Sequence, residues 1–375
     1  MLGFVIVFLT ILSLSSFVFL VSSSIFAPRG SVQWHEIGPG ADESDFTTGF
    51  VVPKRRTQDH RGPPAFIFPD GWPSNHVNDS GVSCNTFPRV IHQTWKDGKT
   101  MPIRFKQWMA SWFEHQPEWR HVLYDDRALE ALVAEHFPEW LAKYKRLRGV
   151  EKADLGRMLV VFVRGGVYVD VDFESIKSLG PLLDEAEKRC RGVILSEETL
   201  VHSYLLERHS EQDRPFVSNA FIAAAPEQPF VKAFLHRVLD KRLRKGLPTY
   251  RDPVTSGSRE LTKLVHEVLK VNDGSLGSIW VLPFNVMFPE ICQWNVGAMR
   301  EKCVGDRPVH SLRDMEWAIK GCPMLAAAMA NTSAFFDDTT LAVHHWQCSW
   351  CPGREHSARD ETFVVAAELP DMRVA

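Results

Sequence analysis

Two aspartates, Asp170 and Asp172, end the stretch RGGVYVDVD and are the residues best suited to chemistry. In an extended strand side chains alternate between faces, so both carboxylates point to one side while Val167, Val169 and Val171 point to the other. Neighbouring carboxylates repel each other unless a cation lies between them. Mg²⁺ and Mn²⁺ accept such oxygen ligands, commonly together with substrate phosphates. The pair therefore predicts a metal–diphosphate site, although a solvated strand end has the same short pattern.

The segment before this strand supplies a further acid and a base. Asp154 and Arg157 are three residues apart in KADLGRMLVVFVRGG, so they share one face of a predicted helix. Gly165 and Gly166 end that helix and fold it back beside the strand. We therefore expect Asp154 and Arg157 near the acid pair, although a simple ion pair on the helix surface explains the same spacing.

Strands and helices alternate along the chain, which predicts an α/β fold with helices on the faces of a sheet. The predicted strands cover residues 90–95, 119–126, 167–172, 191–198, 218–226 and 278–289. The predicted helices cover residues 103–117, 127–144 with a break at Pro138, 150–166, 229–246 and 259–271. Residues 28–85 are rich in proline and glycine and predict an extended stem. The domain is expected at 86–352, followed by a polar C-terminal tail at 353–375.

The N-terminus indicates a membrane. Residues 2–27 contain no charged side chain, and residues 2–21 have the length of a membrane-spanning helix. A signal-anchor at 1–27 fits better than a cleaved signal peptide, because the apolar core is long and no basic residue precedes it. Glycosylation sequons at Asn78 and Asn331 and seven cysteines suit a lumenal domain. We expect a single-pass protein of the Golgi or ER membrane. A net charge of -3 argues against a nucleic-acid partner.

Five motifs, in order along the chain, resemble those of the D-x-D sugar-binding-region glycosyltransferases. They are RVIHQTWK at 89–96, QPEWRHVLYDD at 116–126, KADLGRMLVVFVRGGVYVDVD at 152–172, VSNAFIAAAPEQPF at 217–230 and AVHHWQCSW at 342–350. That family includes the yeast initiating α-1,6-mannosyltransferase, the inositol-phosphoceramide mannosyltransferases and, more distantly, the glucosylating clostridial toxins. The resemblance implies a GT-A type nucleotide-sugar-binding fold, with a mixed sheet flanked by helices, and transfer with retention of configuration.

The resemblance also implies roles for the acidic cluster. Asp172 would coordinate the divalent metal, Mn²⁺ or Mg²⁺, and Asp170 would contact the metal or the donor ribose. Asp154 and Arg157 would hold the transferred sugar or the diphosphate. The chain departs from the family at TSGSRELT, where Ser256-Gly257-Ser258 replaces the usual Thr-Gly-Pro, and no role is carried over to this loop.

The remaining implied residues contact the donor. Trp95 would lie near the base and Asn219 near the sugar. The group expected to close over the pyrophosphate is His345, Trp346, Ser349 and Trp350, with His345 as a further metal ligand. The spacing of His345, Cys348 and Cys351 would also suit zinc, but no fourth ligand is visible.

Together these patterns predict a metal-dependent, retaining hexosyltransferase of the secretory pathway. The expected donor is GDP-mannose, with a UDP-sugar as the alternative, and the acceptor is a glycan, a glycoprotein or a glycolipid. An inositol-phosphoceramide-type lipid mannosyltransferase is one competing hypothesis. A non-catalytic sugar- or nucleotide-binding protein on a degenerate transferase fold is another, and a metal-dependent phosphohydrolase is a third. Retention could follow a front-side route or a double displacement, and no carboxylate nucleophile stands out in the sequence.

Overall fold

The computed structural model describes residue 84 and residues 86–207, 216–245, 256–271, 278–303, 312–347 and 361–375. All of them belong to one compact unit, Pro64–Ala375. The predicted anchor at 1–27 lies outside the described residues, as does the predicted stem except for Cys84. Across the described ranges, no helix has both the length and the apolarity needed to cross a membrane.

A seven-stranded mixed sheet forms the centre of the domain, in the order β11-β3-β1-β4-β7-β6-β8. β1 is parallel to β3 and β4, β11 to β3 and β6 to β8, whereas β7 is antiparallel to both of its neighbours. Two antiparallel pairs, β2–β10 and β5–β9, form separate small sheets. The strands are β1 Val90–Thr94, β2 Thr100–Pro102, β3 Arg120–Tyr124, β4 Gly166–Val169, β5 Phe173–Ser175, β6 Val193–Glu197, β7 Val217–Ala224, β8 Ile279–Leu282, β9 Ala342–His344, β10 Thr362–Val364 and β11 Met372–Val374.

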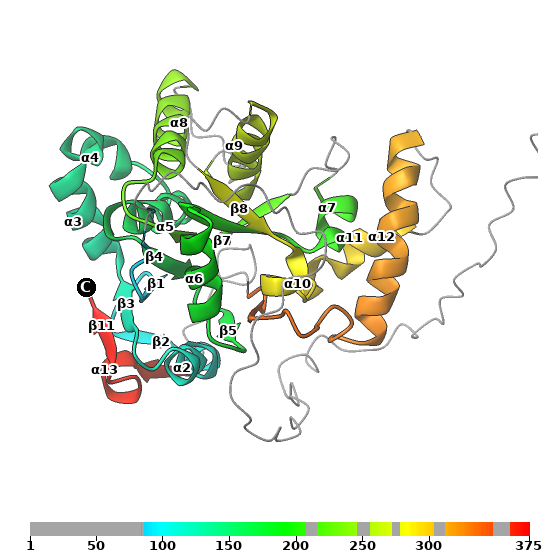
Figure 1. Cartoon of the computed structure of the whole chain (residues 1–375), viewed down its shortest axis with the longest axis horizontal. Coiled ribbons are helices and arrows are strands. Elements are labelled where there is room, and N and C mark those ends of the chain that lie inside the picture. Colours follow the sequence, from blue (N-terminus) through cyan, green and yellow to red (C-terminus); the bar gives the residue numbers. More distant parts are fainter. Residues whose placement is uncertain are drawn as a thin grey trace, which may run out of the picture. The chain divides into compact units, whose positions relative to one another are not determined.

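Helices cover both faces of this sheet, so the predicted mixed sheet flanked by helices is confirmed. Figure 1 shows α8 and α9 together on one side of the sheet and α2 on the other. The α-helices are α2 Lys106–His115, α3 Asp126–His136, α4 Pro138–Tyr144, α5 Gly149–Arg164, α6 Gly180–Lys188, α7 Leu200–Leu205, α8 Pro229–Lys245, α9 Ser258–Val271, α10 Phe284–Met287, α11 Val296–Cys303, α12 Leu312–Ala330 and α13 Val365–Glu368. Short 3-10 turns are η2 Ile103–Phe105 and η4 Gln293–Asn295.

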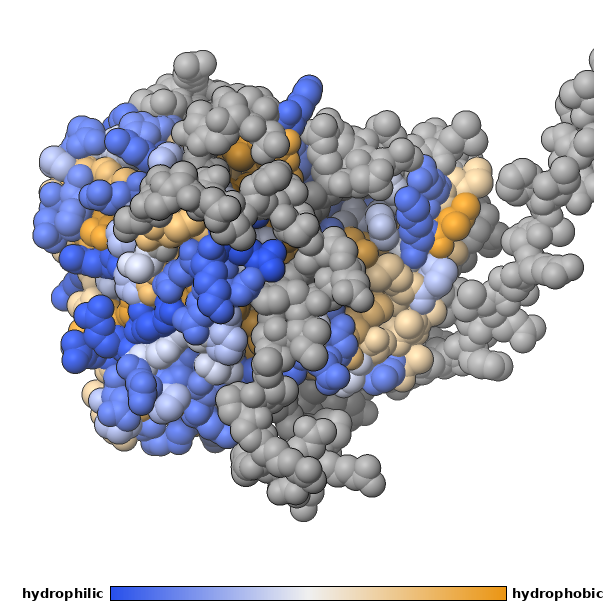
Figure 2. Space-filling view, viewed as in Figure 1, coloured by the Kyte–Doolittle hydropathy of each residue, from blue (hydrophilic) through white to orange (hydrophobic). Residues whose placement is uncertain are grey.

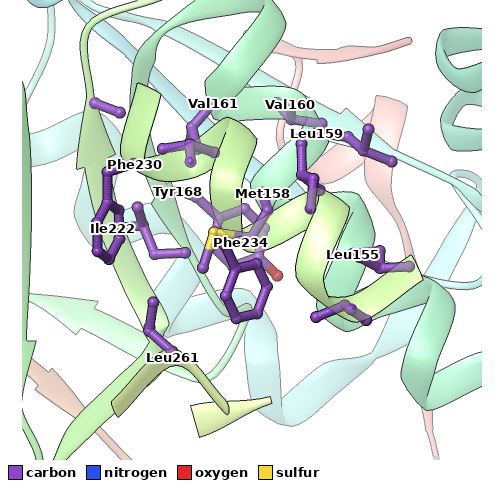
Figure 3. Close-up of a cluster of buried hydrophobic side chains, with 14 of the residues drawn as sticks. Leu155, Met158, Leu159, Val160, Val161, Tyr168, Ile222, Phe230, Phe234 and Leu261 are labelled. Atoms are coloured by element: carbon purple, nitrogen blue, oxygen red, sulfur yellow. The ribbon is translucent and has the colours of Figure 1, made fainter. Parts of the chain in front are cut away.

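One core cluster holds helix α5 against the strand that leads to the acid pair. Figure 3 shows Met158 and Leu159 of α5 beside Tyr168 of β4 and Phe234 of α8. All four side chains are buried. Each large apolar side chain of this kind contributes roughly 1.5–3 kcal/mol when removed from water. The packing therefore fixes the face of α5 that carries Asp154 and Arg157 relative to the end of β4.

The turn between α5 and β4 requires glycine at both positions. Gly165 and Gly166 have φ angles of 61° and 96°, which favour a residue without Cβ. A Cβ atom on Gly166 would lie 2.5 Å from Cγ1 of Val90, and one on Gly165 would lie 2.7 Å from Cδ of Pro226. The two glycines therefore allow both the change of direction and the close approach of β4 to β1.

Two boundaries predicted in the C-terminal half of the chain are wrong. The strand predicted at 278–289 ends at Leu282, and α10 begins after Pro283, which cannot donate a ladder hydrogen bond. Residues 361–375 are not a tail outside the domain, because β11 is the edge strand of the main sheet and β10 pairs with β2. Their buried side chains are Phe363, Val365, Leu369 and Met372. Three-residue strands are too short for alternation to be visible in sequence.

On the face that Figure 2 shows, the described surface carries many hydrophilic residues, with apolar residues in scattered groups between them. Two disulfides, Cys84–Cys190 and Cys303–Cys322, link residues within the described domain. Cys190 follows α6, so the first disulfide ties the chain just before β1 to that helix. The pairing was not predictable from spacing alone.

Candidate active site

The two aspartates lie in a turn at the end of β4. The strand ends at Val169, and the N–H of Phe173 donates to the carbonyl of Asp170 at 3.1 Å, which closes a four-residue turn. The predicted strand is therefore too long by three residues. Alternation still holds up to Asp170, because the hydroxyl of Tyr168, two residues earlier, donates to its carboxylate at 2.6 Å. Asp172 is positioned by the turn and by its own partners.

The carboxylate of Asp170 is held by two donors. Besides the hydroxyl of Tyr168, Nη1 of Arg157 lies 3.2 Å away. Oγ1 of Thr94, at the end of β1, is 2.8 Å from the same Tyr168 hydroxyl and connects two neighbouring strands. Burial raises the pKa of Asp170, Arg157 opposes the rise, and the charge of Asp172 adds to it, so that the pKa stays above its usual value.

The carboxylate of Asp172 is enclosed by the segment 344–347. Nε2 of His344 lies 3.1 Å from one oxygen, and the N–H of Gln347 donates to the other at 2.7 Å. The N–H of His345 donates to the backbone carbonyl of Asp172 at 2.9 Å. Burial alone would raise the pKa of Asp172, but His344 and the hydrogen bonds outweigh it and lower the pKa. Asp170 and Asp172 thus differ in electrostatic environment although they are two residues apart.

Asp154 and Arg157 lie close to the acid pair, as the sequence predicted. Nη2 of Arg157 is 3.5 Å from Asp154, and its Nη1 donates to the carbonyl of Asn219 at 3.0 Å as well as to Asp170. Asp154 accepts from Nδ2 of Asn219 and Oγ of Ser256, both at 2.8 Å. Burial raises the pKa of Asp154, and this effect outweighs Arg157 and the two hydrogen bonds, which lower the pKa. Burial alone would lower the pKa of Arg157, but the surrounding carboxylates outweigh burial and raise the pKa. The guanidinium is therefore a fixed positive charge beside Asp170.

Three side chains at this position have the chemistry of a divalent-cation site. One ligand atom each from Asp170, Asp172 and His344 lies within 4.8 Å of the others. Two carboxylates suit Mg²⁺ or Mn²⁺, and the imidazole is more usual for a first-row transition ion than for Mg²⁺. This donor set fits the implied metal, with Mn²⁺ as the better match.

His345, the histidine expected at the metal, is placed differently. Its Nε2 lies 3.1 Å from Glu174 and its Nδ1 lies 3.1 Å from Glu290, while its ring stacks on Trp108 at 4.4 Å. Burial would lower the pKa of His345, but the two carboxylate hydrogen bonds outweigh burial and raise the pKa to about 9. The adjacent His344 is the histidine whose ring reaches Asp172.

A cleft of about 680 Å³ brings the predicted donor residues together. It is lined by Trp95, Asp154, Arg157, Asp170, Asp172, Asn219 and Trp346. Trp346 has a φ of 54°, a left-handed conformation that costs energy in a residue with a side chain, and its indole N–H donates to the carbonyl of Glu290 at 2.9 Å. Ser349 and Trp350 lie outside the described residues.

The same cleft is also lined by a group that we call the distal group: Glu198, Glu207, Arg259 and Trp294. The indole N–H of Trp294 donates to the carbonyl of Trp346 at 3.1 Å, and Arg259 forms an ion pair with Glu207. Nδ1 of His202 lies 2.9 Å from Glu198. Nε2 of the same ring accepts from the backbone N–H of Cys292 at 2.9 Å.

Several of these contacts had no clear signal in the sequence. Ser256 belongs to the loop that departs from the family pattern, and only the fold brings it to Asp154. Tyr168 could have been found, because it is two residues before Asp170 on the same face of the strand. His344 stands in the motif AVHHWQCSW, but the prediction chose its neighbour His345 instead.

Comparison with known proteins supports the chemistry of this site. Residues 102–189 match the family model described as "Glycosyltransferase sugar-binding region containing DXD motif". The chain is 31% identical over 108 residues to the initiation-specific alpha-1,6-mannosyltransferase of Candida albicans, covering 27% of this chain and 28% of that protein. It is 31% identical over 110 residues to inositol phosphoceramide mannosyltransferase 3 of Schizosaccharomyces pombe, covering 29% and 30%. The aligned segments thus span less than a third of these curated relatives. The predicted family resemblance is confirmed.

Solved structures give more distant likenesses. The PaToxG glycosyltransferase aligns with a TM-score of 0.37 at 14% identity, over 64% of this chain and 87% of that one. The galactosyltransferase LgtC, in complex with donor and acceptor sugar analogs, aligns with a TM-score of 0.34 at 11% identity, over 72% and 90%.

Proposed function

Because the chain carries the sugar-binding region of the D-x-D glycosyltransferases, we propose that it is a metal-dependent, retaining glycosyltransferase with a GT-A type fold. It would transfer a hexose from a nucleotide sugar to a glycan acceptor. The observation that carries this proposal is the cluster of Asp170, Asp172 and His344 in a cleft that also contains the buried cation Arg157.

The residues of the cleft would have different roles in such a transfer. Asp170, Asp172 and His344 would hold the cation, which neutralises charge on the departing diphosphate when bound. Arg157 is fixed by its carboxylate partners and would present its charge to the same diphosphate without reorganising, which is the most effective form of electrostatic stabilisation. Asp154 would orient hydroxyls of the transferred sugar.

GDP-mannose is the donor we propose, with a UDP-sugar as the alternative. The support is that the relatives from Candida albicans and Schizosaccharomyces pombe are mannosyltransferases, which act on different acceptors. Trp95 and Asn219 both line the cleft, which is compatible with the proposed contacts of Trp95 to the base and of Asn219 to the sugar.

The distal group favours a glycan over an inositol phosphate headgroup as acceptor. Its described charged residues, Glu198, Glu207 and Arg259, carry one net negative charge, which would repel an anionic headgroup. Trp294 is 40% exposed at the cleft and offers an aromatic face to a neutral sugar ring. Inositol phosphoceramide transfer is the competing function, because two inositol phosphoceramide mannosyltransferases match 29% and 40% of the chain.

A location in the secretory-pathway membrane completes the proposal. Disulfides form and persist in oxidising compartments, and the described domain contains Cys84–Cys190 and Cys303–Cys322. The uncharged segment 2–27 would anchor the protein, with the domain on the lumenal side.

Thermal unfolding of the detergent-purified full-length protein tests donor and metal together. A ligand that binds the folded state raises the apparent stability by mass action. We expect GDP-mannose with Mn²⁺ to raise Tm, the Asp172→Ala variant to lose that rise, and the exposed control Asp338→Ala to keep it. An equal rise in Asp172→Ala would exclude the metal role of Asp172.

Product analysis separates the remaining functions. We expect Mn²⁺-dependent transfer of mannose to a neutral oligosaccharide and none to inositol phosphoceramide. Donor binding without hydrolysis or transfer over long incubation would instead support a non-catalytic binding protein. Turnover of a generic phosphate ester, with none of the nucleotide sugar, would support a phosphohydrolase.

A further inference from the structure

The ring of His345 is held by three segments that are far apart in sequence. Glu174 belongs to β5, Glu290 lies between α10 and η4, and Trp108 belongs to α2. Each carboxylate lies 3.1 Å from a different ring nitrogen, and the indole of Trp108 covers one face of the imidazole at an interplanar angle of 24°. The ring therefore has defined partners at both nitrogens and on one face.

The hydrogen bonds fix the orientation of the ring. Carboxylate oxygens accept hydrogen bonds, and one such oxygen lies beside each ring nitrogen, so the imidazole is held on both sides. The side chain of His345 is 16% exposed, and those of Glu174 and Glu290 are 23% and 27% exposed. In such a partly buried place, charge-assisted hydrogen bonds are roughly twice as strong as neutral ones.

The backbone of this histidine belongs to the segment that encloses Asp172. Its N–H binds the carbonyl of Asp172, the preceding His344 reaches one carboxylate oxygen, and the N–H of Gln347 binds the other. Trp346, between them, is in the left-handed conformation. Holding the ring of His345 would therefore hold both groups that orient the carboxylate of Asp172.

We propose that His345 is a positioning residue that acts through the backbone: its ring, bound by Glu174, Glu290 and Trp108, fixes residues 344–347 around Asp172 and thereby sets the affinity of the acid pair for a divalent cation. This inference rests on the metal site of the proposed function. It assigns His345 a place beside the metal site but outside the ligand set, with His344 as the ligand.

Direct Mn²⁺ binding, without donor, tests the inference in the full-length protein. Free Mn²⁺ is measured by electron paramagnetic resonance during titration of wild type, His345→Gln, Glu290→Gln and the control His136→Gln. Changing a partner that orients a metal ligand typically lowers metal affinity by about 10–100-fold, so we expect losses in this range for the first two variants. The control should bind like wild type. Glu290→Gln keeps the shape of the side chain but replaces a carboxylate acceptor with a neutral amide, which forms a weaker hydrogen bond to the ring, and it is the milder change if His345→Gln folds poorly.

A His345→Arg variant separates positioning from ligation. Arginine keeps a cation with several donors between Glu174 and Glu290 but does not ligate Mn²⁺, so part of the lost affinity should return. An affinity for His345→Arg as low as that of His345→Gln, with His344→Ala unaffected, would instead make His345 the ligand and overturn the inference. Wild-type affinity in both His345→Gln and Glu290→Gln would also overturn it, while leaving the proposed function intact. Absence of Mn²⁺ binding in wild type would overturn both.

Discussion

Replacing Arg157 by methionine tests whether the buried charges of the cleft depend on one another. The guanidinium of Arg157 contacts Asp154 at 3.5 Å and Asp170 at 3.2 Å, and its side chain is 10% exposed. Methionine keeps an unbranched apolar side chain but removes the positive charge. Arg89 is a matched control, because it also contacts two carboxylates, Asp184 and Glu187, but its side chain is 32% exposed.

The expected effect follows from burial. Removing one member of a buried, hydrogen-bonded charge pair leaves its partners without compensation and costs about 3–5 kcal/mol of the free energy of unfolding. An exposed pair contributes about 0–1 kcal/mol, so Arg89→Met should cost no more than that. Burial already raises the pKa values of Asp154 and Asp170, and loss of Arg157, which lowers both, would raise them further.

The cost of Arg157→Met in unfolding free energy should depend on pH, and the raised carboxylate pKa values predict the direction. A folded-state pKa above the unfolded value penalises the folded protein at higher pH, and the penalty disappears as the pH falls through the folded pKa towards the unfolded one. Urea unfolding in EDTA should therefore show a cost of Arg157→Met that is largest at pH 8 and smaller at pH 5. The cost of Arg89→Met should change little over the same range. Equal, small costs for both variants would refute the idea that Arg157 neutralises buried carboxylates.

Two further predictions concern residues of the strands near the site, Gly166 of β4 and Glu197 of β6, and urea unfolding measures the stability change in both. Gly166→Ala should lower the free energy of unfolding by about 2–5 kcal/mol, because the new Cβ would lie 2.5 Å from Val90 in a residue whose φ is 96°. The control Gly297→Ala has open space around it and should stay within about 1 kcal/mol of wild type. Equal losses in the two variants would contradict the strained turn at Gly166. Burial raises the pKa of Glu197 to about 7, so stability is full below about pH 4.5 and falls as the pH rises through 7. Glu197→Gln should therefore be more stable than wild type at pH 8, by up to about 3 kcal/mol, with no gain near pH 4.5; a gain that does not depend on pH would point to packing instead.

The sequence alone was sufficient for the parts of the site that depend on local periodicity. Helical spacing put Asp154 and Arg157 on one face of α5, and Gly165 with Gly166 marked the reversal into β4. These features are encoded within about 20 residues, because helix faces and turn glycines follow from backbone geometry.

The strand ends were less predictable. Alternation in VYVDVD continues to Asp172, but the structure closes a turn at Asp170 instead, through a hydrogen bond to Phe173. The C-terminal strands β10 and β11 were missed because each has three residues, and their pairing with β2 and β3 joins segments more than 240 residues apart. Such contacts leave no local pattern.

Which of two adjacent histidines contacts the acid pair depends on tertiary structure. The resemblance carried by AVHHWQCSW led us to expect His345 at the metal, whereas the structure brings the ring of His344 to Asp172. Pairing of β9 with β5 decides it, because the register sets His344 opposite Phe173, directly after Asp172. Neighbouring residues of an extended chain point to opposite sides, so a shift of one residue would exchange the two rings. The sequence by itself predicted that the acids and the arginine lie close together, and the family resemblance added a histidine. Only the tertiary structure decided that the ring of His344 contacts Asp172 and that the ring of His345 binds Glu174 and Glu290 instead.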